Sequence, residues 1–223
     1  MAVGAHFDDI EFRAGGTLCK FHEQGWDIVY VITGRYRGDD GRGQKNVNRA
    51  IASGWGAEAV FLDLSWKDWK TKKSQEALHV MRKIMGERIP RMVLSHSSED
   101  LHEDHYMTAR LTYLSFRDAM GHLGEGSALY AWEVGSRGSF SGIPDLERYG
   151  HPDRGALLSP EPDTYVDITG YMDAKEELIS RFNPWVGHHQ WVKKWFREHA
   201  RVLGKRTGVE YAEGFKTILR AGM

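Results

Sequence analysis

Short runs of β-branched and aromatic residues alternate with longer amphipathic segments along most of the chain. This alternation is typical of a parallel sheet covered by helices. The clearest strand is residues 27–33, where Ile28 to Ile32 form an unbroken apolar run, as in a strand buried on both faces. We therefore predict an α/β, Rossmann-like fold: a mostly parallel sheet with helices on both faces, in a single domain over residues 1–223.

The pattern gives bounds for each element. The predicted strands are Ala2–Ala5, Asp27–Thr33, Ala59–Leu62, Met92–Ser95, Leu129–Val134 and Tyr165–Ile168. The predicted helices are Ala14–Gln24, Asn46–Gly54, Ser74–Arg88, one that begins around His102–Asp104, Asp173–Phe182 and Trp191–Leu203, followed by a last regular segment at Tyr211–Leu219. We expect loops at 34–45, rich in Gly and Arg, and at 136–163, which contains four of the six prolines.

Composition narrows the class of protein. A chain of 223 residues, 41% of them hydrophobic, is long enough to bury a full core. A net charge of −1 provides no field that would steer nucleic acid or an anionic membrane, and no apolar run is long enough to span a bilayer. The single cysteine, Cys19, fits a reducing compartment and a small buried hydrophobe. We expect a cytoplasmic protein.

A polar cluster follows the first predicted strand. His6, Asp8, Asp9 and Glu11 lie within six positions, just ahead of Gly15-Gly16-Thr17. An imidazole and several carboxylates at one strand end provide a nitrogen ligand, an oxygen ligand and a spare base. These are the parts of a metal site that activates water.

A second polar cluster, residues 96–105, follows the predicted strand 92–95 and includes His96, His102 and His105. In a doubly wound sheet the first and fourth strands are commonly neighbours, and ligands bind in the crevice beyond their carboxyl ends. The two clusters are therefore expected to converge.

With these motifs the sequence resembles the LmbE-like (PIG-L) zinc-dependent de-N-acetylases, which remove acetyl groups from N-acetylglucosamine-type sugars. The resemblance rests on residues 6–11 with 15–17, and on His102-Glu103-Asp104-His105. Looser similarity continues through 165–169, Lys175 and 211–215. It therefore extends over most of the chain.

The resemblance implies a role for each residue of the clusters. His6, Asp9 and His105 would hold the zinc, and two imidazoles with one carboxylate are a usual catalytic zinc set. Asp8 would be the general base that takes a proton from the attacking water. His102 would face the substrate, where it stabilises the oxyanion or donates a proton. Glu11 is expected to orient a ligand or to satisfy backbone amides.

The implied activity is hydrolysis of an N-acetyl group on a small-molecule amino sugar, with zinc or another divalent metal such as Fe²⁺. No nucleic-acid partner is expected, whereas the exposed aromatic residues favour a homo-oligomer. The family tends to carry Arg-x-x-Glu after the second strand to bind substrate. Here Arg42 and Arg49 both remain candidates for that role.

Several other interpretations stay open. The first cluster could be only a capped turn, and Asp100-Leu101-His102-Glu103 only a capping box. His6, Asp8 and His105 also match the ligand types of a non-haem iron oxygenase, which is usually a β-rich barrel. A non-catalytic nucleotide-binding module is a third interpretation, although the first turn lacks Gly-x-Gly-x-x-Gly. His188-His189 could line the pocket or lie on the surface.

Overall fold

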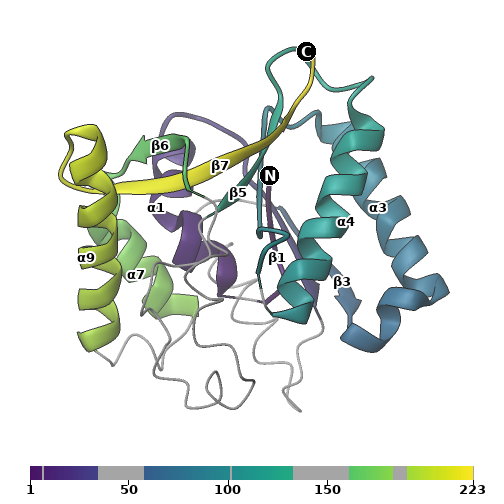
Figure 1. The fold of residues 1–223 in the computed structure, drawn as a ribbon, viewed down its shortest axis with the longest axis horizontal. Helices are drawn as coiled ribbons and strands as arrows, with labels where there is room; N and C mark the ends of the chain where they lie inside the picture. The colour runs from purple at the N-terminus through teal and green to yellow at the C-terminus, as the bar shows by residue number, and fades with distance from the viewer. Residues whose placement is uncertain (7, 35–57, 101, 133–160, 183–189, 223) are drawn as a thin grey trace.

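The computed structural model describes residues 1–6, 8–34, 58–100, 102–132, 161–182 and 190–222 (Figure 1). The expected helix 46–54 lies outside these residues, as do all but the ends of the expected loops 34–45 and 136–163. The same holds for Arg42, Arg49 and His188-His189.

Every predicted element within the described residues is present, with shifted ends. The strands are β1 (Ala2–Gly4), β2 (Val29–Gly34), β3 (Glu58–Leu64), β4 (Met92–Ser95), β5 (Ala128–Trp132), β6 (Thr164–Asp167) and β7 (Ala212–Arg220). The α-helices are α1 (Asp9–Glu23), α3 (Lys72–Arg88), α4 (Glu103–Ala119), α7 (Met172–Phe182) and α9 (Gln190–Thr207). Two short 3₁₀ helices, η1 (Trp66–Lys70) and η2 (Thr169–Tyr171), were not predicted.

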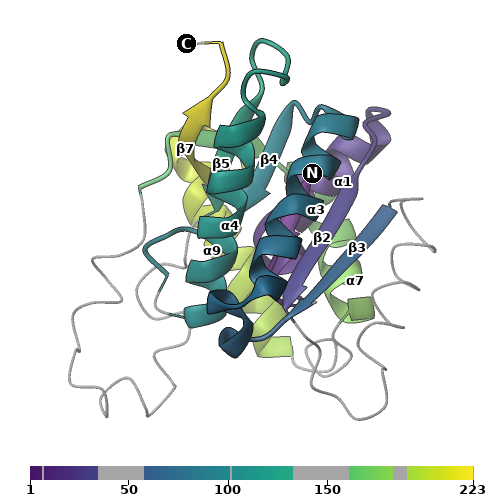
Figure 2. The ribbon, with the colours of Figure 1, turned by 90° about the vertical axis from the view of Figure 1, so that its right-hand side faces the viewer.

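The described strands form one sheet in the order β3-β2-β1-β4-β5-β7-β6. The first five strands are parallel, whereas β7 runs antiparallel to both β5 and β6 (Figure 2). This confirms the prediction of a Rossmann-like, mostly parallel sheet. The expected neighbours β1 and β4 are paired, with Val3 opposite Ser95. The sheet is open, so the β-rich barrel of the oxygenase alternative is not formed.

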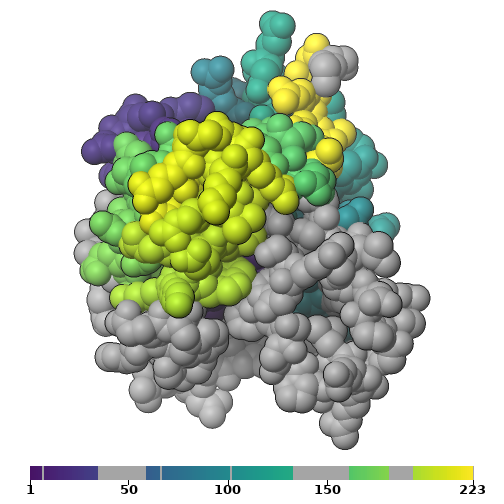
Figure 3. All heavy atoms as spheres, turned by 60° about the vertical axis from the view of Figure 1, so that its left-hand side comes forward, coloured from purple at the N-terminus to yellow at the C-terminus, as the bar shows by residue number. Residues whose placement is uncertain are grey.

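Helices cover both faces of the sheet, as predicted. On one face α1 and α7 pack together, and Ile10, Ala14 and Leu18 of α1 join Tyr30 and Phe215 in a buried cluster. On the other face α3 and α4 pack over a second cluster. A third cluster lies under α9, which forms a continuous surface with residues 161–182 at that end of the molecule (Figure 3). No helix in the described part of the chain is long and apolar enough to span a membrane.

Helix α1 begins five residues earlier than predicted, at Asp9 instead of Ala14. Asp8 is its N-cap residue, and Asp9 and Glu11 lie in the first turn, where the helix dipole favours carboxylates. The polar cluster, which was expected to precede the helix, is therefore its first turn. This places Asp8 and Asp9 on a rigid element.

A buried ion pair holds α1 against the C-terminal strand. Lys175 Nζ lies 2.6 Å from Glu213 Oε1, and both side chains are almost fully buried. The two Glu213 oxygens also accept hydrogen bonds from the backbone N–H groups of Gly16 (3.0 Å) and Thr17 (2.7 Å). A Cβ on Gly16 would lie 2.8 Å from Ile168, so this approach requires glycine. The Gly15-Gly16-Thr17 motif therefore serves packing.

Glu213→Gln should destabilise the protein by about 3–5 kcal/mol, because it leaves the Lys175 ammonium buried without its counter-charge. Urea denaturation measures this. The control is Glu87→Gln, which breaks the exposed pair with Lys83 (3.8 Å) and should cost less than about 1 kcal/mol. Equal effects of the two variants would contradict a structural role for the buried pair.

Candidate metal centre

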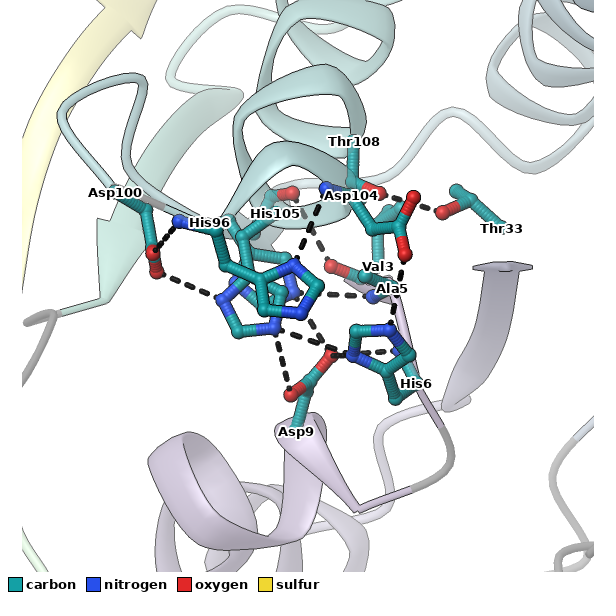
Figure 4. A network of polar contacts seen from close by, with 12 residues as sticks. Val3, Ala5, His6, Asp9, Thr33, His96, Asp100, Asp104, His105 and Thr108 are labelled. Atoms are coloured by element: carbon teal, nitrogen blue, oxygen red, sulfur yellow. Dashed lines mark hydrogen bonds and ion pairs between the residues drawn. The ribbon is translucent and has the colours of Figure 1, made fainter. Parts of the chain in front are cut away.

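The two polar clusters converge at the carboxyl ends of β1 and β4 (Figure 4). His6 and Asp9 come from the turn after β1 and the start of α1. His96 follows β4, and His105 lies in the first turn of α4. The structure thus brings together residues that are almost a hundred positions apart, as the predicted strand order required.

The three predicted ligands lie at the separations that a tetrahedral zinc site needs. His6 Nδ1 is 3.2 Å from His105 Nε2 and 3.4 Å from Asp9 Oδ2, and His105 Nε2 is 3.4 Å from Asp9 Oδ1. Ligands bound tetrahedrally at zinc distances of about 2.0–2.1 Å are about 3.3–3.4 Å apart. The donor set of two imidazoles and a carboxylate therefore fits zinc in composition and in spacing.

The nitrogen of each imidazole that points away from this site faces a carboxylate. His105 Nδ1 lies 2.8 Å from Asp100 Oδ2, and His6 Nε2 lies 3.4 Å from Asp104 Oδ2. A neutral histidine that donates from one ring nitrogen leaves the other as a lone-pair ligand. The two carboxylates therefore direct Nε2 of His105 and Nδ1 of His6 toward the metal position. Sequence reasoning assigned no such role to Asp100 or Asp104.

Electrostatics at the site favour a cation. Burial alone would lower the pKa of His105, but its hydrogen bonds to Asp100 and Asp9 outweigh burial and raise the pKa to about 9. Burial would likewise lower the pKa of His6, and Asp9 reverses that effect and raises it. The surrounding imidazoles hold the pKa of Asp9 well below its usual range although burial opposes them. The site therefore holds protons that a metal ion would displace.

His96 supports Asp9 from the buried side. The indole N–H of Trp132 donates to His96 Nδ1 (3.3 Å), which leaves the ring proton on Nε2, 3.1 Å from Asp9 Oδ2. Burial lowers the pKa of His96 to about 4, so the ring is neutral. The backbone N–H of His6 also donates to Asp9 Oδ2, at 2.6 Å. Sequence reasoning quoted His96 without giving it a role; its position directly after a buried strand was the available signal.

Two other groups in the described chain could also surround a cation. The ligand atoms of His6, His102 and His105 lie within 4.8 Å of one another, and so do those of Asp9, His96 and His105. Neither His96 nor His102 has a carboxylate that frees a ring nitrogen for a metal: His96 donates to Asp9 itself, and Nδ1 of His102 caps α4. The contacts thus favour His6, Asp9 and His105.

His102 is the N-cap of α4, where its Nδ1 accepts from the backbone N–H of Asp104 (3.2 Å). Burial, together with nearby His105 and His6, lowers the pKa of His102. A neutral ring that accepts at Nδ1 carries its proton on Nε2. The cap therefore makes Nε2 a hydrogen-bond donor. Asp100 accepts from the backbone N–H of His102 (2.9 Å), so the predicted capping box is replaced by a histidine cap.

The remaining acidic residues of the first cluster differ in environment. Asp8, next to the ligand Asp9, is half-buried. Glu11 is completely buried, and burial raises the pKa of its carboxyl well above its usual range, so it is a neutral acid. Its oxygens accept no hydrogen bond from a backbone amide of the described residues, so the expectation that it satisfies such amides was wrong. Cys19 is partly buried, and burial raises its pKa to about 12, in line with a packing role.

A sequence model of the PIG-L family, described as GlcNAc-PI de-N-acetylase, matches residues 1–115. This match spans just over half of the 223 residues and contains all the site residues named above. The chain belongs to the PIG-L family.

Solved structures share the fold of this PIG-L family protein. GalB, the 4-carboxy-2-hydroxymuconate hydratase from Pseudomonas putida KT2440, superposes with a TM-score of 0.72 at 20% identity, over 100% of this chain and 96% of that one. The conserved protein TT1542 from Thermus thermophilus gives 0.72 at 20%, over 98% and 94%. The N,N'-diacetylchitobiose deacetylase from Pyrococcus horikoshii gives 0.68 at 17%, over 97% and 82%. The fold is thus shared by a hydratase and by a deacetylase.

If Asp100 directs the lone pair of His105 toward the metal, Asp100→Asn should weaken zinc binding by about 10–100-fold in this PIG-L family protein. Competition with a chelator of known affinity measures the change. Glu99→Gln, at the exposed neighbouring position, is the control and should bind zinc like the unchanged protein. Wild-type zinc affinity in Asp100→Asn would show that the hydrogen bond does not prepare the ligand.

Zinc affinity should also rise with pH below about pH 9, because zinc must displace the proton of His105, whose pKa is about 9. Each released proton makes the affinity fall about tenfold per pH unit below the pKa of its group. Asp9, with its lowered pKa, contributes no such term near neutral pH. Calorimetry at pH 7 in buffers of different ionisation enthalpy should detect at least one proton released per zinc. No proton release would contradict the ligand assignment.

Proposed function

We propose that this PIG-L family protein is a metal-dependent hydrolase that removes the N-acetyl group from an amino sugar, with zinc held by His6, Asp9 and His105. The observation that carries the proposal is the pair of carboxylates, Asp100 and Asp104, on the far nitrogens of the two imidazoles. This arrangement fixes which nitrogens face the metal position and has a direct use only if a metal binds there.

A zinc ion in this position would supply Lewis acidity and lower the pKa of a water molecule. Asp8 is assigned the general base: it takes a proton from the water that attacks the amide carbonyl and gives it to the departing amine. Its place at the N-cap of α1 keeps it beside Asp9 without using it as a ligand.

His102 is assigned the stabilisation of the anionic oxygen that develops on the amide carbonyl. Its Nε2 carries a proton because Nδ1 accepts from the α4 backbone. The lowered pKa keeps the ring neutral near pH 7, so His102 acts as a hydrogen-bond donor with a fixed direction. Capping and catalysis are thus compatible in this residue.

The substrate class follows from the family and its structural relatives. The family model is named for removal of an acetyl group from GlcNAc-PI, and similar structures include deacetylases for N,N'-diacetylchitobiose and for the A40926 pseudoaglycone. We infer that the partner is a small-molecule N-acetylated amino sugar and that nucleic acid is not bound. Zinc is the proposed metal, with Fe²⁺ as the other divalent ion to test.

The direct test is release of acetate and of a primary amine from a panel of N-acetylated sugars by zinc-loaded and iron-loaded protein. Equal amounts of the two products, abolished by a chelator and restored by metal, support the proposal. A protein that adds water to a carbon–carbon double bond of an unsaturated acid and leaves the acetamides intact would be a hydratase, and the proposal would then be wrong.

Asp8→Asn should retain about one zinc per chain and lose about 10²-fold or more in turnover, because the amide cannot accept the proton from water. Asp9→Ala should lose the metal as well. Metal content and kcat measured on the same preparations separate the two roles. Asp27→Asn, on an exposed carboxylate, is the control and should change neither quantity. Loss of zinc in Asp8→Asn would make Asp8 a ligand.

A further inference from the structure

A cavity of about 440 Å³ lies between α4 and the strands β5 and β7. This volume falls in the range of small-molecule sites. Figure 2 shows β5 and β7 beside α4 at the edge of the layer that α3 and α4 form. The side chains that line the cavity and bear on the argument are His96, Ser98, Tyr106, Arg110, Tyr113 and Ile218.

The cavity continues the surface of the metal centre. His96 belongs to both, since it contacts Asp9 and also lines the cavity. Tyr106 and Arg110 follow His102 by four and eight positions, so the three residues form one stripe along α4. A molecule bound beside His102 would therefore meet Tyr106 and then Arg110.

Arg110 supplies an uncompensated positive charge along this stripe. Its guanidinium contacts the hydroxyl of Tyr106 at 3.4 Å, and no carboxylate among the described residues lies within ion-pair distance of it. Arg117, one helix face further on, differs because Asp118 pairs with it at 2.8 Å. A guanidinium with free donors in a cavity is suited to a carboxylate or a phosphate, which it can bind with two parallel hydrogen bonds.

The other walls suit a sugar and its substituent. Tyr106 and Tyr113 are 38% and 39% exposed, and Ile218 of β7 is 40% exposed, so the lining offers aromatic and aliphatic surface to a ligand. Arg110 follows the ligand His105 by five positions, which is a rise of about 7.5 Å along the helix. With the reach of the arginine side chain, this span matches one sugar unit and the group attached to it.

We propose that this cavity binds the part of the substrate that extends beyond the acetamido sugar, and that this part carries a carboxylate or phosphate bound by Arg110. The identity of the ligand as a substrate rests on the proposed function, whereas the anion site can be tested without turnover. Arg110 is then a specificity-determining residue, since it discriminates substrates by a group remote from the amide.

The test is calorimetric titration of the zinc-loaded protein with three deacetylated probes: glucosamine, glucosamine 1-phosphate and the glucosaminide of glycolic acid. At least one anionic probe should bind about tenfold or more tightly than glucosamine. Arg110→Gln should remove most of this advantage while metal content stays the same. Arg91→Gln, an exposed arginine at the far end of β4, is the matched control and should keep the advantage. The phosphate and carboxylate probes show which anion is preferred.

Two results would overturn the proposal: no advantage of either anionic probe over glucosamine, or an advantage that survives Arg110→Gln, which would place the anion on the metal. Failure of the proposed function gives a different pattern. In that case the probes bind in an Arg110-dependent manner, which supports the anion site, while no N-acetylated sugar is hydrolysed.

Discussion

The hydrogen bond between Asp100 and His105 is the interaction on which the metal centre depends. It occupies Nδ1 of the imidazole and so leaves Nε2 for the space shared with His6 and Asp9. The same carboxylate accepts the backbone N–H of His102, so it also fixes the start of α4. One aspartate thereby sets the direction of a ligand and the position of the residue assigned to the oxyanion.

The fold supplies what this interaction cannot, namely the approach of two distant segments. Pairing of β1 with β4 brings His6 and Asp9 to the carboxyl end of the strand that precedes Asp100. The buried Lys175–Glu213 pair then holds α1, and with it Asp9, through two backbone amides. Stability and chemistry are connected here, because the helix that carries Asp9 is anchored by groups that never touch the substrate.

Much of this could be predicted from the sequence because the apolar runs of a parallel sheet are buried on both faces and are easily recognised. The strand order and the convergence of the clusters followed from that pattern. The supporting roles of His96, Asp100 and Asp104 did not, because a hydrogen bond to the far nitrogen of an imidazole depends on side-chain direction and not on spacing. The early start of α1 was missed because its first turn is polar, and the fixed direction of His102 arises only from its position as a cap.

The geometry of the site implies that a single metal ion binds between His6 Nδ1, His105 Nε2 and the Asp9 carboxylate. Anomalous diffraction from crystals of the zinc-loaded protein, recorded on both sides of the zinc absorption edge, locates that ion directly. We expect one peak per chain at about 2.0–2.2 Å from each of these three groups. A peak bound by His96 or His102 in place of one of them, or no peak at this end of the sheet, would contradict the ligand assignment.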